Sequence, residues 1–195
     1  LVLAQFAWVA GFGLWYLRRR GLDRESIVSY LGIERPTGRQ LALVVGAAIG
    51  MVVAAGVVNL LLTQLVELLG FEIEAAENES TQILENNPSP LLLLGGVALM
   101  MFVVGPAEEL LFRGVIQGRL RERLSPAKAI VAASVLFGSV HLTALGGGSG
   151  AAGLLLTIAV LSTVALVLGS LYEYTGNLVV VALTHGLYNS ILITM

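Results

Sequence analysis

The chain contains no cysteine, which excludes disulfide bonds and every metal site built on thiolates. Charge is also scarce, because only 12% of the 195 residues are charged, about half the share of a typical soluble domain. The formal net charge of −2 lacks the basic excess of a nucleic-acid-binding protein. No linker rich in proline, glycine or serine divides the sequence, so we expect a single membrane domain over residues 1–195.

The chain is rich in apolar residues. Hydrophobic residues make up 56% of it, and the mean hydropathy is +0.87. Several runs approach or exceed the roughly 20 residues that a helix needs to cross a bilayer. We therefore predict an all-α, polytopic membrane helix bundle of about six transmembrane helices. The predicted spans are 1–17, 40–69, 91–118, 127–145, 151–172 and 177–194, with a short interfacial helix at 26–31 that ends at Gly32.

The basic residues predict the orientation of the bundle. All eleven lie within 18–39 or 113–128, whereas the loop at 70–90 carries glutamates and no basic residue. Because excess Lys and Arg mark cytoplasmic loops, 18–39 and 119–128 are predicted to be cytoplasmic, with 70–90 and 146–150 outside. The charges of 113–123 further predict that this part of the chain projects from the membrane. The chain begins within an apolar run, and we expect it to be a piece of a longer protein.

Ionisable side chains, which are energetically unfavourable in a membrane, interrupt three of these apolar segments. The only two histidines, His141 and His185, lie in two of them, and the adjacent acids Glu108 and Glu109 lie in a third. Ionisable side chains are expensive at membrane depth and usually mark a protein interior or a functional site. Their presence on three separate segments predicts one shared site.

Helical spacing supports this prediction. Glu109 and Arg113 are four residues apart and can form an ion pair, whereas Glu108 is turned about 100° away and is free for another role. The purely structural alternative, in which both acids only neutralise Arg113, needs one acid rather than two. Glu108 and His141 lie equally far from the turn predicted near 125–126, so they should stand at the same height in a helical hairpin.

The other two motifs place polar side chains on common helix faces. His141 follows Phe137 by four residues, and His185 precedes Asn189 by four. A single histidine in a membrane helix can simply hydrogen-bond a neighbouring helix, and that alternative weakens when all the motifs are taken together.

The three motifs resemble the signature motifs of the CPBP family. They are Glu-Glu-x-x-x-Arg at 108–113, Phe-x-x-x-His at 137–141 and His-x-x-x-Asn at 185–189. This family comprises the type II CAAX prenyl endopeptidases and the bacterial and archaeal abortive-infection-type proteins. The resemblance covers about 91–194, which would form the catalytic core. The family core usually has eight helices, which implies that N-terminal spans are missing or that this is a short member.

The resemblance implies an intramembrane endopeptidase. Because Glu108 and His185 lie closer to the basic loops than to the other face, we predict that its site opens toward the cytoplasm. Glu108 would be the general base, His141 would hold and polarise a water molecule, and His185 and Asn189 would donate hydrogen bonds to the oxyanion. Structural support would come from Glu109, Arg113 and Phe137. The expected partners are membrane lipid and a peptide or protein substrate, with a prenylated C-terminus as the substrate class of the eukaryotic members.

Two questions stay open at this point. The family is often called a metalloprotease, and Glu108, His141 and His185 could bind zinc. A mechanism without a cofactor is slightly preferred, because there is no His-Glu-x-x-His motif and neither histidine has a carboxylate partner on its own helix. The rival functions are a non-catalytic scaffold of the same fold and a proton-coupled transporter, although no internal repeat typical of transporters is present.

Overall fold

Helices form all the regular structure in the part of the chain that the computed structural model describes, residues 2–71, 89–144 and 150–195. No strand occurs within these ranges, which confirms the all-α prediction. Most of the predicted outer loop at 70–90 and of the predicted turn at 146–150 lies outside the described residues.

Each predicted span corresponds to helical structure. The first half of the chain forms α1 (Val2–Arg19), α2 (Arg24–Leu31) and α3 (Gly38–Leu68). A continuous helical run then covers 90–121 as α5 (Pro90–Leu99), η1 (Met100–Val104), α6 (Gly105–Glu109), η2 (Leu110–Gln117) and α7 (Gly118–Arg121). The remaining elements are α8 (Pro126–Val140), the 3-10 turn η3 (His141–Ala144), α9 (Ala151–Thr175) and α10 (Leu178–Leu192).

Local capping explains why the predicted interfacial helix forms. The Asp23 carboxylate accepts a hydrogen bond from the Ser26 amide at 2.8 Å and caps the start of α2. Hydrogen bonds from the Ser26 side chain and amide hold the pKa of the Asp23 carboxyl below its usual range. Gly32 ends α2 with φ of 60°, a left-handed conformation that glycine adopts without steric cost. The predicted end of this helix is therefore confirmed.

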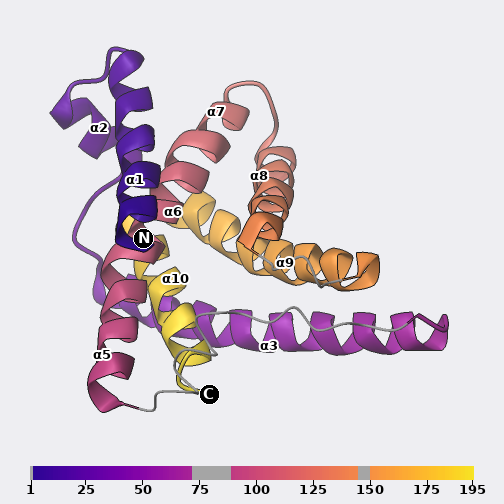
Figure 1. Cartoon of the computed structure of the whole chain (residues 1–195). Helices are drawn as coiled ribbons and strands as arrows, with labels where there is room; N and C mark the ends of the chain where they lie inside the picture. Colours follow the sequence, from indigo (N-terminus) through magenta and orange to yellow (C-terminus); the bar gives the residue numbers. More distant parts are fainter. Residues whose placement is uncertain (1, 72–88, 145–149) are drawn as a thin grey trace.

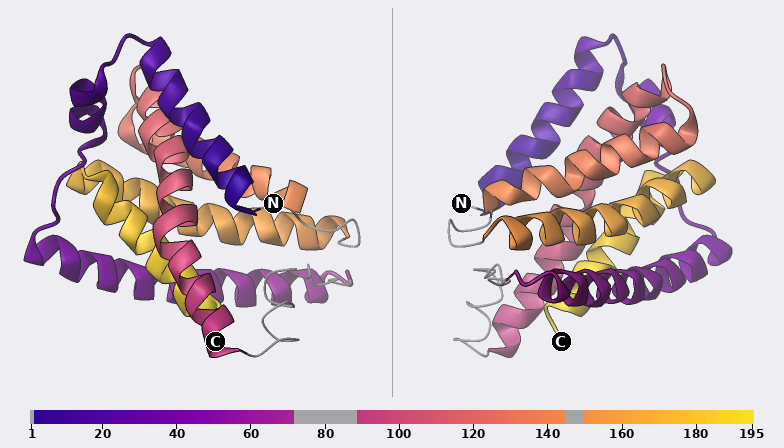
Figure 2. Two further views of the ribbon diagram at one scale, coloured as in Figure 1. Left: turned by 60° about the vertical axis from the view of Figure 1, so that its left-hand side comes forward. Right: turned by 90° about the vertical axis from the view of Figure 1, so that its right-hand side faces the viewer.

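The helices do not form an upright bundle of parallel rods. α9 lies between α8 and α3, and α3 and α9 run side by side across the 90–121 run (Figures 1 and 2). α10 packs against α3 and α9 on one side and against η1 and α6 on the other. A core of apolar residues joins α3, α9 and α10, and it includes Met51, Leu168 and Val181. This core fixes α10 relative to α9, so that its polar residues face the 90–121 run.

Three helical stretches of the described chain are long and apolar enough to cross a membrane. They are Gly38–Leu68, Pro90–Arg121 and Ala151–Thr175, with lengths of 31, 32 and 25 residues. α8 and α10 are apolar but shorter, at 15 residues each. These stretches indicate an integral membrane protein, and the total of six spans stays a prediction.

The two predicted cytoplasmic loops lie at the same end of the molecule. Arg20, after α1, pairs with Glu122, after α7, at 2.9 Å. Arg121 pairs with Glu173 near the end of α9, also at 2.9 Å. Both basic segments therefore meet beside the α9–α10 turn, as a common cytoplasmic side requires. We call this region the basic end.

The prediction that 113–123 projects from the membrane stays a prediction, but two of its polar side chains are buried within the protein. Arg113 and Gln117 are only 2% and 1% exposed. The Arg113 guanidinium donates to the Ala165 carbonyl at 3.0 Å, and the Gln117 amide donates to the Gly169 carbonyl at 3.1 Å. Because α9 supplies these acceptors, η2 packs into the interior, and the exposed charges begin only beyond it.

Cysteine labelling tests the predicted orientation in a chain that has no native cysteine. Ser125 lies in the turn at the basic end and Ser89 precedes α5, and both are exposed. We expect Ser125→Cys to react with an impermeant thiol reagent only in inside-out vesicles, and Ser89→Cys only in right-side-out vesicles. The reverse pattern would overturn the topology.

Candidate active site

A helical hairpin brings the first two polar motifs together. The 90–121 run and α8 are joined by a turn at 122–125, and they place a Glu108 carboxylate oxygen, Oε1, 3.8 Å from His141 Nε2. The prediction that Glu108 and His141 stand at the same height above this turn is therefore confirmed.

Close backbone packing brings α10 to the same place. A Cβ atom on Gly105 would lie 2.9 Å from the Ala182 carbonyl oxygen, and one on Gly186 would lie 2.8 Å from Met101 Cα. Larger side chains at either glycine would push the helices apart. As a result His185 Nε2 lies 3.6 Å from the second Glu108 carboxylate oxygen, Oε2.

Two widened π-helical segments flank the adjacent acids, and the sequence analysis missed them. η1 ends just before α6 and η2 begins directly after Glu109. Pro106 lacks an amide hydrogen and cannot make the regular α-helical bond to the carbonyl four residues earlier, which favours an irregular helix here. Such π segments occur frequently at functional sites.

Glu109 is completely buried and forms two charge-assisted contacts. Its Oε1 accepts hydrogen bonds from Arg113 Nη1 at 3.1 Å and from His185 Nδ1 at 2.7 Å. Its Oε2 lies 3.1 Å from Arg113 Nε but without hydrogen-bond geometry. The predicted ion pair is present, whereas the contact with His185 was not anticipated, because nothing in the spacing of residues 109 and 185 indicates it.

These contacts fix which nitrogen of each histidine carries a proton. A carboxylate only accepts hydrogen bonds, so His185 Nδ1 must be the donor to Glu109. His141 Nδ1 lies 2.7 Å from the Phe137 carbonyl and must likewise donate. In the neutral form both rings therefore turn an unprotonated Nε2 toward Glu108.

Phe137 packs at the centre of these side chains. Its ring centroid lies 4.5 Å from that of His141 and 5.8 Å from that of His185. The Arg113 guanidinium carbon lies 5.2 Å from the same ring, which adds a cation–π contact. Phe137 thus restricts the positions of both imidazoles.

Asn189 is the predicted site residue that the structure does not join to the others. It is half-buried on α10, one turn beyond His185 and about 6 Å further along the helix axis. Within the described residues its side chain forms no hydrogen bond. Its amide is therefore available to a substrate.

Exposure differs between the two acids. The Glu108 side chain is 13% exposed and His141 is 28% exposed, whereas Glu109 is 0% exposed. Water can reach Glu108 and His141, so these two can take part in hydrolysis. A separate apolar hollow of about 480 Å³ between α1 and η1–α6 is not lined by any of the predicted site residues.

The donor chemistry suits zinc, but the spacing does not. Glu108, His141 and His185 offer the imidazole and carboxylate atoms that zinc prefers. Glu109, from another helix, supplies the carboxylate partner that His185 lacks on its own. However, no group of three His, Asp or Glu side chains in residues 2–71, 89–144 and 150–195 lies close enough to hold a metal.

Comparison with known proteins gives one family match. The family model described as Type II CAAX prenyl endopeptidase Rce1-like matches residues 90–191, which include all three motifs. No curated protein and no solved structure matches the chain.

Removal of Arg113 should destabilise the protein. Arg113→Ala strips the ion pair from the buried Glu109 carboxylate, and breaking a buried pair typically costs about 3–5 kcal/mol. The control is Arg121→Ala, which breaks the partly exposed pair with Glu173, a kind of pair worth about 0–1 kcal/mol. Melting temperature and monomer yield in detergent are the measurements. Equal melting temperatures for the two variants would contradict the burial of this pair.

Proposed function

We propose that this chain, which belongs to the Rce1-like family of type II CAAX prenyl endopeptidases, hydrolyses peptide bonds with a water molecule activated by Glu108. Family membership makes the chain a CAAX-protease-like membrane enzyme, and the family acts on protein or peptide substrates. The roles of individual residues, the absence of a required metal and the prenylated substrate are our proposals.

The observation that carries the proposal is the position of Glu108 between two histidines. Its two carboxylate oxygens lie 3.8 Å from His141 Nε2 and 3.6 Å from His185 Nε2. These distances are too long for direct hydrogen bonds, so the carboxylate and the two imidazoles do not satisfy one another and are open to a shared water. A water molecule held there contacts both a base and an imidazole.

The reaction begins with proton transfer from this water to Glu108. His141 Nε2 accepts a hydrogen bond from the other water hydrogen and fixes the direction of the oxygen lone pair. The oxygen then forms a bond to the substrate carbonyl carbon, which becomes a tetrahedral oxyanion. When the carbon–nitrogen bond breaks, Glu108 returns its proton to the departing nitrogen. The products are a carboxylic acid and an amine, which become a carboxylate and an ammonium ion when the acid gives its proton to the amine.

His185 and Asn189 are the proposed donors to the oxyanion. Because His185 Nδ1 is committed to Glu109, its Nε2 donates only when the ring carries both protons. The His185 ring lies between the carboxylates of Glu109 and Glu108. The Asn189 amide, one turn along α10, supplies a neutral donor.

The proposed substrate approaches from the cytoplasmic side. The basic end carries the loops that the charge distribution predicts to be cytoplasmic. His185 lies eight residues beyond Asn177 at this end, or about 12 Å of helix. A short C-terminal segment of a substrate can span this depth, and a prenyl group attached to it would lie in the surrounding lipid.

Replacement of the base should abolish cleavage without unfolding the protein. Glu108→Gln keeps the size of the side chain but removes its basicity, and loss of a general base costs about 10²–10⁴-fold in rate. Purified variants are assayed by mass spectrometry on a prenylated peptide and on the same peptide without the lipid, with exposed Glu67→Gln in α3 as the control.

Full activity of Glu108→Gln would refute the role of this residue. No cleavage of either peptide by the wild-type protein would favour the scaffold. Equal cleavage of the two peptides would remove prenylation from the proposal.

Removal of metal ions tests whether the reaction requires one. We expect cleavage to survive exhaustive dialysis against a chelator, with well under one equivalent of metal retained. If zinc acted as the Lewis acid, chelation would abolish cleavage and stoichiometric zinc would restore it. Loss of cleavage with rescue by zinc would leave the same residues in the site but would show that they act through a metal.

A further inference from the structure

We infer that residues 24–36 are a positioning element that holds η2 and the start of α10 at a fixed separation. We call these residues the α2 clamp. They lie outside the segment 90–191 that matches the family model. The inference rests on the proposed function, because the two elements that it joins carry the proposed active-site residues or their supports.

The first side of the clamp packs against η2 and the residue after it. The buried Leu31 side chain lies where a Cβ atom on Gly114 would be, and the Tyr30 hydroxyl lies where one on Gly118 would be. A Cβ atom at either position would force these side-chain ends to move, and Leu31 is buried at 1% exposure whereas Tyr30 is 37% exposed. Ile27 and Leu31 also join an apolar cluster with Leu110, Val115 and Leu178, which come from η2 and α10.

The second side of the clamp is tied to the turn before α10. The Asn177 side chain donates from Nδ2 to the Glu34 carbonyl at 3.1 Å, while its Oδ1 accepts from the Val179 amide at 2.9 Å and caps α10. Gly32 lies directly against the Gly176 carbonyl, where any larger residue would collide. One buried asparagine therefore fixes the start of α10 to the clamp.

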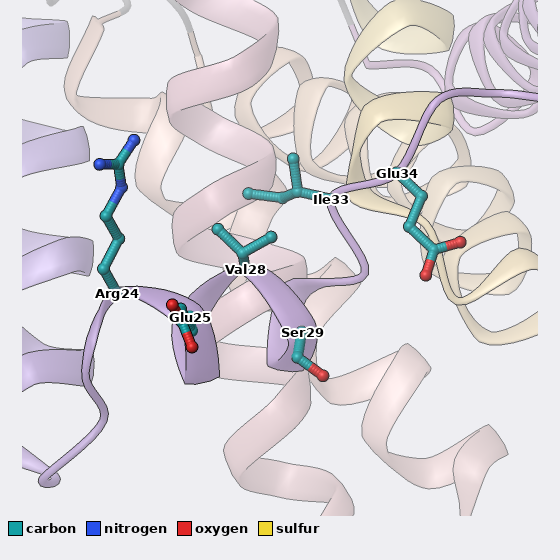
Figure 3. A pocket seen from close by; sticks show the side chains of 6 residues that line it. All are labelled: Arg24, Glu25, Val28, Ser29, Ile33 and Glu34. Atoms are coloured by element: carbon teal, nitrogen blue, oxygen red, sulfur yellow. The ribbon is translucent and has the colours of Figure 1, made fainter.

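The outer side of the clamp has no comparable packing. A hollow of about 450 Å³ lies there and is lined by residues of the clamp itself. Figure 3 labels them: Arg24, Glu25, Val28, Ser29, Ile33 and Glu34. Of these, Val28 and Ile33 are about two-fifths exposed, at 40% and 41%. The clamp is therefore anchored by its inner side, where η2 and α10 meet it.

This arrangement bears on the active site because the 90–121 run, of which η2 is part, also meets α10 at Glu109 and His185. η2 begins directly after Glu109 and contains Arg113, and α10 carries His185. The 2.7 Å contact between Glu109 and His185 is one connection between this run and α10, and the α2 clamp is a second. A change in the clamp should therefore move His185 Nε2 relative to Glu108 while the catalytic side chains stay intact.

A substitution with a second-site rescue tests the contact with η2. Gly114→Ala places a methyl group against Leu31, and Leu31→Val removes the methyl that it would strike. We expect Gly114→Ala to lower kcat about 10- to 100-fold, the size of effect that a small displacement of catalytic groups produces. KM on the prenylated peptide should stay within about twofold, and Leu31→Val should restore kcat in the double variant.

Matched variants distinguish a displacement of the active-site side chains from the general effect of adding a methyl group to a helix. Gly50→Ala adds the same methyl group in α3, where nothing lies within 4 Å, and should leave kcat unchanged. Asn177→Asp keeps an oxygen to cap α10 but loses the amide that binds Glu34, so it should lower kcat as Gly114→Ala does. Full activity of both Gly114→Ala and Asn177→Asp would overturn the inference, as would a loss of activity in Gly114→Ala that Leu31→Val does not repair.

The NMR signals of the His185 ring report its position without any need for a substrate. The chain has two histidines, so selective ¹⁵N-histidine labelling gives a simple spectrum, with His141→Gln used for assignment. We expect the His185 ring signals to shift in Gly114→Ala and to return in the double variant. If the wild-type protein cleaves neither peptide, the proposed function fails and the spectra alone decide: unchanged His185 signals in Gly114→Ala would refute the clamp.

Discussion

The buried carboxylate of Glu109 is the group on which the rest of the site depends. A charge with no exposure to solvent is costly unless it is paired, and Glu109 is paired twice, with Arg113 and with His185. Arg113 is buried as well and donates from Nη2 to the Ala165 carbonyl of α9. Satisfying one carboxylate thus ties together the 90–121 run, α9 and α10, and it determines which nitrogen of His185 faces Glu108.

The two adjacent acids consequently have different environments and different proposed roles. They are turned about 100° apart on the helix, so that Glu109 faces the interior while Glu108 faces both imidazole Nε2 atoms and is partly exposed. Because Arg113 neutralises Glu109, Glu108 is left without a permanent cationic partner within the described residues. An acid that has no such partner and is reached by water is suited to act as a base, whereas its neighbour is suited to orient a ring.

Sequence periodicity predicted the helical class, the positions of the helices and the meeting of Glu108 with His141, because these follow from local spacing and hairpin symmetry. It did not predict the contact of Glu109 with His185, since that contact depends on the close packing of Gly105 against Gly186. The interior position of Arg113 and Gln117 was also missed, because exposed and buried charges look alike in a sequence and only α9 supplies the acceptors. The π segments and the α2 clamp arise from tertiary packing for the same reason.

We propose that Glu109 acts through His185, and a double-mutant cycle measures the coupling between the two residues. The kcat/KM for the prenylated peptide is measured for the wild type, Glu109→Gln, His185→Gln and the double variant. If Glu109 serves to orient His185, Glu109→Gln should cost about tenfold or more in the wild-type background and less than about twofold once His185 is replaced. Equal fold losses in the two backgrounds would show that Glu109 acts independently of His185 and would contradict the account.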